Sequence, residues 1–551
     1  MSAFNKPMGA SAKWQVKLAR ALHPQISQIK QICEISGVAG VSVVVLDHGL
    51  RVFEQNIGYR DVANKEPVTS DTVFHVGSLT KAFTGVCINQ MRSRGRLQFD
   101  DPIHKHLPEA RSCDPAVASL ATIADLLGHR IGLQKANELW LGADNEELFE
   151  EDQIWAVFRN LAPMVPFRSR FSYHNFGWAL LGDIVTEVTG QAYHEYLKEN
   201  ILDPLGMDRT FVTKDHGLPD NTSLAYSTLD NGEPYNVPLF SGSSKTLMGP
   251  AGGLLSTTND LAKWCKELMS AWQVQAHGGR CRKYEDVFGD ISWLFAPLQI
   301  LGRPTFRENS YAAGWARTLL PNGVGSLGAN PDLVSKMPVL GEGINSPRLA
   351  LWHQGSLTGA TSFIMLLPDT ESAVIVLTNT MAPNDAADWI GQLLAETLLD
   401  TPTRNDYVAL ASESADRALK LYSELSVRIE EGKTPGGPPR ALDDYIGTYV
   451  GFGDLFSIVV RKAENGLEML LQGRETQKYE LHHHHDNTFT WFISWNEQIK
   501  RGRFINYQDG IYFVRFRVGH MSGGVVALNW AYEAGLPDGE EFLREVSEGV
   551  L

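Results

Sequence analysis

Ser78 and Lys81 stand three residues apart in the stretch Gly77-Ser78-Leu79-Thr80-Lys81, at the predicted start of a helix. This spacing puts both side chains on one helix face, one turn apart. A helix N-terminus carries a positive partial charge and free backbone N–H groups, and both favour an alkoxide. A serine there can attack a substrate if the neighbouring amine takes its proton, which requires that burial or a nearby cation first deprotonates the amine. The pair therefore indicates catalysis by a serine nucleophile.

The surroundings of this pair matter because the spacing alone is common. Ser27 and Lys30 share it and are expected on the surface of an amphipathic helix. Ser78 instead follows a glycine and precedes an apolar helical run that ends at Met91. The sequence therefore predicts a buried helix start at Ser78, where chemistry can take place, against the alternative of a helix cap with a solvated lysine.

Two more motifs could contribute to the same site. Tyr173-His174-Asn175 is the only Tyr-x-Asn in the chain and begins 95 residues after Ser78. His353-Gln354-Gly355 begins 180 residues after Tyr173, and it alone among the His-x-Gly triplets precedes a predicted buried hairpin. The alternatives are a core aromatic for Tyr173, packing beside Trp352 for His353, and a backbone requirement for Gly355.

These motifs and their flanks resemble the serine β-lactamase-like superfamily, which includes class C β-lactamases, DD-peptidases, D-aminopeptidases and related esterases and acyltransferases. The resemblance runs from about Val38 to Leu399. The flanking segments that carry it are 97–102, 122–129, 176–182, 203–207 and 251–257. The segment after the catalytic region resembles, more loosely, the lipocalin-like barrel that some members of the superfamily carry.

The resemblance implies a role for each matching residue. Ser78 would be the acylated nucleophile, and Lys81 would either take its proton or keep Tyr173 ionised. Tyr173 would be a base toward Ser78 and an acid toward the leaving group; which of the two residues is the base stays open. Asn175 would bind Lys81 and the acyl side chain of the substrate. The oxyanion would lie between the backbone N–H groups of Ser78 and Ser356.

Two departures from the superfamily pattern affect the expected substrate. Many β-lactamases have Lys-Thr-Gly at the third motif, where this chain has His353, and histidine is only partly charged near neutral pH. Inefficient β-lactam hydrolysis is therefore expected. The second departure lies in residues 128–133, Gly-His-Arg-Ile-Gly-Leu. Relatives usually have a small polar pair after the histidine at position 129, and this chain does not. Apolar residues within 273–348, namely Trp293, Leu294, Phe295 and Trp315, are expected at the pocket mouth, where they favour an acyl or aromatic ligand.

Composition excludes several classes of function. The chain has 551 residues and a formal net charge of −15, which argues against binding to nucleic acid or to anionic membranes. The N-terminal residues 1–6 show no basic-then-apolar signal pattern, no apolar run approaches about 18 residues, and the five scattered cysteines form no disulfide framework. A cytoplasmic protein is expected, and the absence of an export signal argues against peptidoglycan as substrate.

No cofactor and no metal are expected. The run His482-His483-His484-His485 invites a metal hypothesis, but consecutive residues of a strand point to opposite faces. At most alternate histidines could therefore share one ion, and a partly exposed barrel strand is the preferred interpretation. The expected partner is a small-molecule acyl substrate; the oligomeric state, including a homo-oligomer, stays open.

The order of predicted elements indicates an α/β (α+β) fold, a sandwich of antiparallel sheet and helices. Residues 13–36 read as a helix broken at Pro24, 38–46 and 52–58 as two strands, 363–367 and 373–378 as a buried hairpin, and 273–348 as irregular. The predicted domains are a β-lactamase-like catalytic domain (1–400), a helical connector and linker (401–440) and a lipocalin-like β-barrel (441–551). The barrel strands are predicted at 456–460, 467–471, 488–493, 503–507 and 511–518.

We therefore expect a serine hydrolase that forms an acyl-enzyme at Ser78 and cleaves a small-molecule ester, thioester or amide. The first alternative is an acyltransferase that uses the same acyl-enzyme but passes the acyl group to an alcohol or amine. The second is a catalytically silent binding or scaffold protein. Silent descendants usually lose the serine or the lysine, and this chain keeps both.

Overall fold

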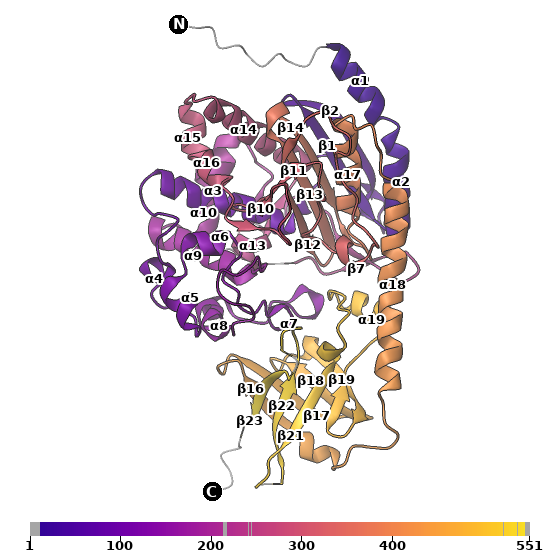
Figure 1. Ribbon diagram of the computed structural model, residues 1–551. Helices are drawn as coiled ribbons and strands as arrows, with labels where there is room; N and C mark the ends of the chain where they lie inside the picture. Colours follow the sequence, from indigo (N-terminus) through magenta and orange to yellow (C-terminus); the bar gives the residue numbers. More distant parts are fainter. Residues whose placement is uncertain are drawn as a thin grey trace.

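A nine-stranded antiparallel sheet forms the centre of the larger part of the molecule (Figure 1). The computed structural model describes residues 12–212, 217–240, 242–243, 245–521, 523–536 and 538–545, so the predicted lack of a signal at residues 1–6 lies outside it. In spatial order the strands are β3 (Glu66–Pro67), β2 (Leu50–Asp61), β1 (Gly40–Asp47), β14 (Ser372–Thr378), β13 (Ala360–Leu367), β12 (Arg348–Leu357), β11 (Ala316–Leu320), β10 (Asn309–Tyr311) and β9 (Gln299–Ile300).

The three central strands are buried along their whole length, since helices cover both faces of the sheet. Their β-branched and apolar residues suit this position, and they pair in a register that sets Val43 opposite Val376. On one face α17 (Ala386–Leu398) packs against β13 and β14, with α1 (Ala12–Leu22), α2 (Gln25–Ser36) and α18 (Tyr407–Glu431) beside it. On the other face α14 (Thr258–Ala276) packs against β1 and β14 (Figure 1).

A helical region lies beyond α14 and contains the helices that position the site, α3 (Thr80–Ser93), α9 (Asn175–Thr189) and α13 (Met248–Gly252), which pack against one another. The other helices here are α4 (Ile103–His106), α5 (Pro115–Leu120), α6 (Ile123–Leu127), α7 (Asn137–Trp140), α8 (Ile154–Asn160), α10 (Tyr193–Leu197), α11 (Asp203–Leu205), α15 (Arg282–Phe288) and α16 (Ile291–Leu294). Two small sheets accompany them, β4 (Phe74–His75) with β8 (Leu254–Ser256) and β5 (Phe211–Val212), and β15 (Thr380–Met381) with β6 (Ala225–Thr228) and β7 (Pro234–Val237).

The structure confirms the predicted fold class and corrects one segment of it. Pro24 separates α1 from α2, and the predicted hairpin is β13 with β14. Residues 273–348 are not irregular throughout, because β9, β10 and β11 complete one edge of the main sheet. These strands are two to five residues long, too short for an alternating pattern to stand out in the sequence.

A closed eight-stranded antiparallel barrel forms the C-terminal part of the molecule (Figure 1). Its strands are β16 (Gly447–Gly451), β17 (Phe456–Ala463), β18 (Gly466–Leu471), β19 (Lys478–His485), β20 (Thr488–Thr490), β21 (Phe513–Val518), β22 (Val525–Trp530) and β23 (Glu540–Arg544), and one helix, α19 (Trp495–Lys500), follows β20. The barrel closes where β16 pairs with β23, which leaves no free sheet edge. Large aromatic side chains fill its interior, including Trp491, Tyr449 and Trp530.

Residues 503–507 are not a barrel strand, contrary to the prediction, but an extended stretch without ladder pairing. The side chain of Arg503 leaves the barrel to pair with Glu138 of α7, and Tyr512 donates its hydroxyl hydrogen to the backbone oxygen of Asn506. These contacts take the place of strand hydrogen bonds.

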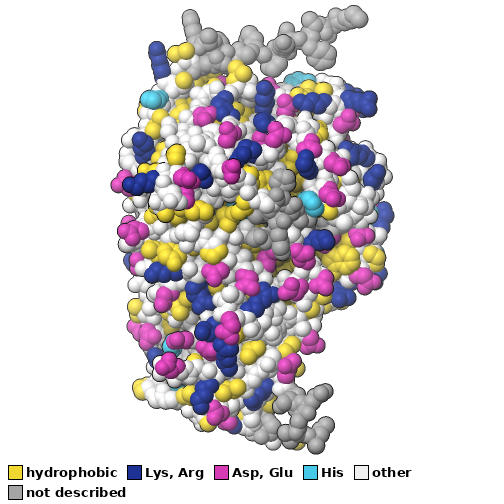
Figure 2. All heavy atoms as spheres, turned by 180° about the vertical axis from the view of Figure 1, so that it is seen from behind, with side chains coloured by type: hydrophobic (Ala, Val, Ile, Leu, Met, Phe, Trp, Pro, Cys, Tyr) yellow, Lys and Arg dark blue, Asp and Glu magenta, His cyan; other side chains and the backbone are white. Residues whose placement is uncertain are grey.

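The long helix α18 runs beside both parts of the molecule (Figure 1). It packs against α2 at one end and meets the barrel at the other, where Tyr422 stacks on Phe492. The segment 432–439 that follows is exposed, as expected of a linker. Within the described residues no helix combines the length and the apolar character needed to cross a membrane. Figure 2 shows acidic and basic side chains interspersed over the face it displays.

Candidate active site

Ser78 lies in a tight turn between β4 and α3, within the 3₁₀ turn Gly77–Leu79. Gly77 adopts the left-handed region with φ of 52°, and a β-carbon there would lie 2.8 Å from the backbone nitrogen of Ser356. Only glycine fits such a turn without strain or a clash. Thr80 stabilises the turn by donating to the carbonyl oxygen of Gly77 at 2.7 Å. The result is a half-buried serine side chain at the N-terminus of a buried helix.

The structure brings the three predicted catalytic side chains together. Lys81 Nζ lies 3.1 Å from Ser78 Oγ, and the Tyr173 hydroxyl donates to the same oxygen at 2.7 Å. Lys81 also donates to Asn175 Oδ1 at 3.0 Å and to the carbonyl oxygen of Ala251 at 2.6 Å. Three segments far apart in the sequence, on α3, before α9 and in α13, thus converge on one hydroxyl group.

The burial of Lys81 determines its charge. Its side chain is fully buried, and among the described residues no carboxylate forms an ion pair with it. Desolvation therefore lowers the pKa of Lys81 well below its usual range, which favours the neutral amine. Burial also raises the pKa of Tyr173, so its phenol stays protonated in the resting site.

His174, the middle residue of the second motif, has a structural role that the sequence did not reveal. Its Nδ1 accepts the backbone N–H of Gly177 at 3.1 Å and thereby caps α9. Its Nε2 must then carry the proton, which it donates to the carbonyl oxygen of Gln134 at 2.7 Å. Burial lowers the pKa of His174 to about 4, so the ring is neutral. The cap fixes the start of α9 and with it Tyr173 and Asn175.

His129, within the unusual segment 128–133, supports Tyr173 from one side. The two rings stack with centroids 4.3 Å apart and an interplanar angle of 22°. The backbone N–H of His174 points at Nδ1 of His129 at 2.9 Å, and the indole N–H of Trp178 points at Nε2 at 3.0 Å. Because the ring is fully buried and the Lys81 amine lies nearby, the pKa of His129 is well below its usual value. A neutral ring thus supports the phenol of Tyr173.

The third motif approaches Ser78 through the backbone of β12. Strand β11 pairs with β12 only as far as Trp352, so the end of β12 faces the turn around Ser78 instead. A β-carbon at Gly355 would lie 2.1 Å from the carbonyl oxygen of Val76 and 3.0 Å from the backbone nitrogen of Ser78. Glycine is therefore required for this approach, which brings the backbone of Ser356 beside that of Gly77.

The side chain of His353 lies in the protein interior, behind Tyr311, and has no contact with solvent. It is fully buried, donates from Nδ1 to the backbone oxygen of Gln354 at 2.6 Å, and accepts the Tyr311 hydroxyl at Nε2 at 2.9 Å. Burial and the nearby Lys81 amine lower the pKa of His353 to about 3, so it carries no charge at neutral pH. Tyr311 lies on β10, within the segment that the sequence predicts as irregular, so no motif or periodic pattern points to it.

The apolar residues expected at the pocket mouth do not lie there. Leu294, Phe295 and Trp315 are buried in the core and offer no surface to a ligand. Trp293 is partly exposed, but it packs on the guanidinium group of Arg92 near the far end of α3 from Ser78. The expected preference for an acyl or aromatic ligand therefore loses this support.

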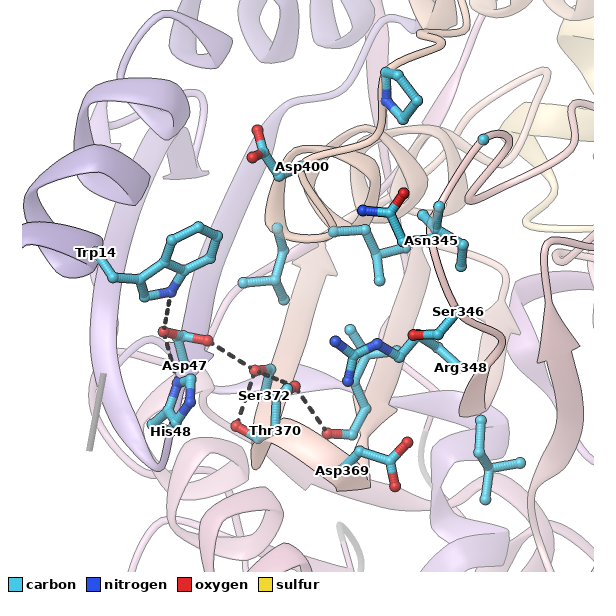
Figure 3. A pocket seen from close by; sticks show the side chains of 17 residues that line it. Trp14, Asp47, His48, Asn345, Ser346, Arg348, Asp369, Thr370, Ser372 and Asp400 are labelled. Carbon is cyan, nitrogen blue, oxygen red and sulfur yellow. Dashed lines mark hydrogen bonds and ion pairs between the residues drawn. The ribbon is translucent and has the colours of Figure 1, made fainter. Parts of the chain in front are cut away.

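The described residues contain no group of three or more His, Cys, Asp or Glu side chains placed to hold a metal ion. The four consecutive histidines lie at the end of β19, where His484 is buried against α18 and its neighbours are more exposed. A cavity of about 420 Å³ lies between α1 and the ends of β12 and β14, lined by Trp14, Asp47 and Arg348 among others (Figure 3). It includes none of the residues around Ser78.

Comparison with known proteins finds family matches for both parts of the chain. The family model described as Beta-lactamase matches residues 27–397, and one described as Domain of unknown function (DUF3471) matches residues 431–544, which contain the barrel. The solved structure of the octameric penicillin-binding protein homologue from Pyrococcus abyssi aligns over 96% of this chain and 99% of its own with a TM-score of 0.53. At 20% sequence identity that match shows the shared fold.

Curated relatives match the catalytic region at low identity. Protein flp of Staphylococcus aureus is 23% identical over 342 residues, 62% of this chain and 60% of its own length. A beta-lactamase of Yersinia enterocolitica is 23% identical over 359 residues, 64% of this chain and 85% of its own length. The chain thus spans about 60% of the Staphylococcus relatives that it matches. Because the family model covers more than half of the sequence, the chain belongs to the beta-lactamase family.

Proposed function

We propose that this protein is a serine hydrolase that forms an acyl-enzyme at Ser78 and cleaves a small-molecule ester, thioester or amide. The observation that carries the proposal is the position of Ser78 Oγ, which lies 3.1 Å from Lys81 Nζ and 2.7 Å from the Tyr173 hydroxyl. Membership of the beta-lactamase family and the penicillin-binding-protein-like fold support a serine hydrolase in general. The ester or amide substrate is the finer part of the proposal.

The hydrogen-bond inventory favours Lys81 as the base. A neutral amine has two N–H groups and one lone pair. Asn175 Oδ1 and the carbonyl oxygen of Ala251 accept the two N–H groups, which leaves the lone pair for the hydroxyl hydrogen of Ser78. Tyr173 meanwhile donates to Ser78 Oγ. Every proton in this arrangement has an acceptor, and no group has to be charged before the substrate binds.

The reaction follows from this arrangement. As Ser78 Oγ attacks the substrate carbonyl carbon, its proton passes to Lys81, and the carbonyl oxygen becomes an oxyanion facing the backbone N–H groups of Ser78 and Ser356. Collapse of the tetrahedral intermediate breaks the bond to the leaving group, which takes the Tyr173 proton. The resulting phenolate is stabilised by the Lys81 ammonium, whose nitrogen lies 4.8 Å from the tyrosine ring centroid. A water molecule then hydrolyses the acyl-enzyme by the reverse proton path.

The third motif argues for substrates without an essential carboxylate at that position. His353 is neutral and lies behind Tyr311, so it offers no cation to a β-lactam carboxylate. A hydrogen bond to a charged group contributes about 1.5–3 kcal/mol, or roughly 10–100-fold in rate or affinity. We therefore expect a cephalosporin to react much more slowly than an uncharged aryl ester, although a relative is named a beta-lactamase.

Labelling with a fluorophosphonate, followed by a panel of chromogenic esters, D-amino-acid amides and a cephalosporin, tests the proposal. Covalent modification at Ser78, its loss in Ser78→Ala, and turnover of at least one ester or amide are expected. An unmodified Ser78 in folded protein would contradict the proposal and favour a silent binding protein. If an added alcohol or amine receives most of the acyl groups in place of water, the protein is an acyltransferase.

Two variants distinguish the base from the acid. Lys81→Met should slow acylation by about 10²–10⁴-fold with every substrate, because proton removal from Ser78 is always needed. Tyr173→Phe should slow acylation strongly with an alkyl ester but weakly with a nitrophenyl ester, whose leaving group needs no proton. Equal losses for both esters in Tyr173→Phe would instead make Tyr173 the base toward Ser78.

A further inference from the structure

Residues 134–150, here called the bridging segment, pass between the C-terminal barrel and the active-site region. The segment contains α7 and the short 3₁₀ turn Ala143–Asn145, and α7 lies next to the barrel (Figure 1). It touches the barrel on one side, and on the other it touches the second active-site motif and the residue that follows β12, the strand that carries the third motif. This placement gives the barrel a path to the catalytic groups.

On the barrel side, Tyr532 and Glu533, which follow β22, bind the start of the bridging segment. The carboxylate of Glu533 accepts the backbone N–H groups of Lys135 and Ala136, each at 3.0 Å. The hydroxyl of Tyr532 accepts the side-chain N–H of Gln134 at 3.2 Å. Ala136 adopts the left-handed region with φ of 49°, which is costly for a residue with a β-carbon. The contacts from Glu533 therefore stabilise a backbone conformation that the segment would not prefer alone.

On the active-site side, the same Gln134 receives the hydrogen bond from His174. The carbonyl oxygen of Gln134 accepts the Nε2–H of His174 at 2.7 Å, and its side-chain oxygen accepts the backbone N–H of Ala162 at 2.7 Å. Gln134 and His174 are buried, so an unpaired polar group here would be costly. Gln134 thus bonds both to Tyr532 of the barrel and to His174. His174 caps α9 and stands between Tyr173 and Asn175 in the second motif.

A second path reaches the third motif. Gln477 of the barrel accepts the backbone N–H of Ala143 at 2.7 Å and donates to its carbonyl oxygen at 3.1 Å. In the same 3₁₀ turn as Ala143, Asn145 donates to the carbonyl oxygen of Thr358 at 3.1 Å. Thr358 directly follows β12 and lies two residues after Ser356. The barrel therefore holds the bridging segment at two points, and each point leads to a different motif.

We propose that the barrel is a positioning element of the active site, in which Tyr532 and Glu533 hold residues 134–136 so that Gln134 fixes His174 and, through it, Tyr173 and Asn175. The proposal rests on the proposed acyl-enzyme chemistry only for its catalytic readout. Tyr532, Glu533 and Gln134 are positioning residues, since none of them contacts Ser78 in the structure.

Hydrogen exchange in the full chain tests the positioning directly. In Glu533→Ala, peptides that cover residues 171–182 should exchange at least about tenfold faster than in the unmodified protein, because the hold on Gln134 and His174 is weakened. Glu533→Gln keeps an acceptor oxygen and should restore most of the protection. Unchanged exchange in Glu533→Ala would overturn the proposal, whatever the protein catalyses.

A matched control separates positioning from general contact between the two parts. Asn496 of the barrel exchanges two hydrogen bonds with Asp230, at 2.9 and 2.8 Å, in the turn between β6 and β7. Asn496→Ala also removes side-chain hydrogen bonds between the barrel and the catalytic part, but none of them leads to His174, so exchange in 171–182 should stay unchanged. Faster exchange of 171–182 in both variants to the same extent would show general loosening and contradict a specific path.

The rate of Ser78 labelling by a fluorophosphonate supplies the catalytic readout. Glu533→Ala should label several-fold more slowly than Asn496→Ala, and Glu533→Gln should fall between them. If the unmodified protein does not label at all, the proposed function fails, while hydrogen exchange still decides the positioning role. If it labels and Glu533→Ala labels as fast as Asn496→Ala, the barrel does not position the catalytic groups.

Discussion

The basic side chains around Ser78 are buried, no carboxylate of the described residues pairs with them, and burial favours the neutral form of each. Lys81, His129, His174 and His353 all have a pKa below the usual range, and in each case desolvation is the largest cause. A neutral lysine can take a proton at the moment of attack, and neutral histidines beside it do not repel the ammonium that forms. These properties suit the proposed general-base catalysis, which needs no permanent charge at the site.

A buried pair of carboxyl groups lies next to the third motif. Asp385 accepts the side-chain N–H of Gln354 at 2.8 Å, and Asp388, one helical turn on, accepts that of Asn330 at 2.8 Å. Burial raises the pKa of both groups, and the neighbouring Asp388 adds to the shift of Asp385. Because Gln354 stands between His353 and Gly355, its hydrogen bond to Asp385 connects the pair to the third motif.

The pair makes stability depend on pH. In the unfolded chain an aspartic acid loses its proton near pH 4. The folded protein keeps the proton to higher pH, so the folded state binds more protons in this window and the free energy of unfolding falls as pH rises. Asp385→Asn cannot ionise, so between pH 5 and 8 its Tm should fall less than that of the unmodified protein in a thermal-melt series.

Asp416→Asn is the control, because Asp416 is an exposed carboxylate on α18. It should follow the pH dependence of the unmodified protein. If the melting curves of Asp385→Asn and the unmodified protein shift in parallel over this range, the buried pair does not hold an extra proton.

At the scale of elements, the site depends on the contact between β12 and the turn before α3. The hydroxyl of Ser362 on β13 donates to the carbonyl oxygen of Val76 at 2.8 Å, so the central strand of the sheet helps to hold the turn in place. Gly355 leaves room for this approach, and Gly77 supplies the left-handed turn. Two glycines thus allow strand β12 and the start of α3 to come together at the proposed oxyanion site.

Gly355→Ala should disturb this contact at its closest point. The added methyl group would meet the carbonyl oxygen of Val76 at 2.1 Å and push β12 away from Ser78. Loss of oxyanion stabilisation typically slows reaction by about 10²–10³-fold, and we expect Ser78 labelling to slow by a comparable factor with a lower Tm. The measurement is the labelling rate by mass spectrometry.

Gly437→Ala serves as the matched control for this substitution. Gly437 lies in the exposed linker, and a β-carbon there meets no atom within 4 Å. Its labelling rate and Tm should equal those of the unmodified protein. Normal labelling in Gly355→Ala would show that the backbone of β12 does not form part of the oxyanion site.

At the scale of the whole molecule, the barrel and the catalytic part share one continuous cluster of buried apolar side chains. A nearly buried ion pair crosses between them, from Arg503 of the barrel to Glu138 of α7. Arg503 also donates to the hydroxyl of Tyr479 at 2.6 Å, and these partners raise the pKa of its guanidinium group. The two parts are therefore expected to unfold together.

Arg503→Met should lower the free energy of unfolding by about 3–5 kcal/mol, because it leaves the carboxylate of Glu138 buried without its cation. Urea denaturation followed by tryptophan fluorescence measures the change. The control is Arg517→Met, which removes an exposed barrel pair with Glu541 at 2.7 Å and should cost no more than about 1 kcal/mol. Equal costs for both variants would contradict a structural role for the buried pair.

The grouping of Ser78, Lys81 and Tyr173 could be predicted from the sequence because short motifs carry these residues. The Ser78–Lys81 spacing places both side chains on one helix face wherever that helix lies, and the flanks of Tyr173 and His353 carry the family pattern. The fold class, the β13–β14 hairpin and the barrel could also be predicted, since long runs of buried or alternating residues reveal them.

The tertiary structure alone decided what surrounds these groups. Four features join residues far apart in the chain. They are the edge strands β9 to β11, the burial of His353 behind Tyr311, the stacking of His129 on Tyr173, and the hydrogen bonds from Tyr532 through Gln134 to His174. Local periodicity specifies which face of an element is apolar, but not which distant element covers it. The charge of a buried lysine or histidine depends on that cover, so the sequence determined the reactive groups and the packing determined their protonation.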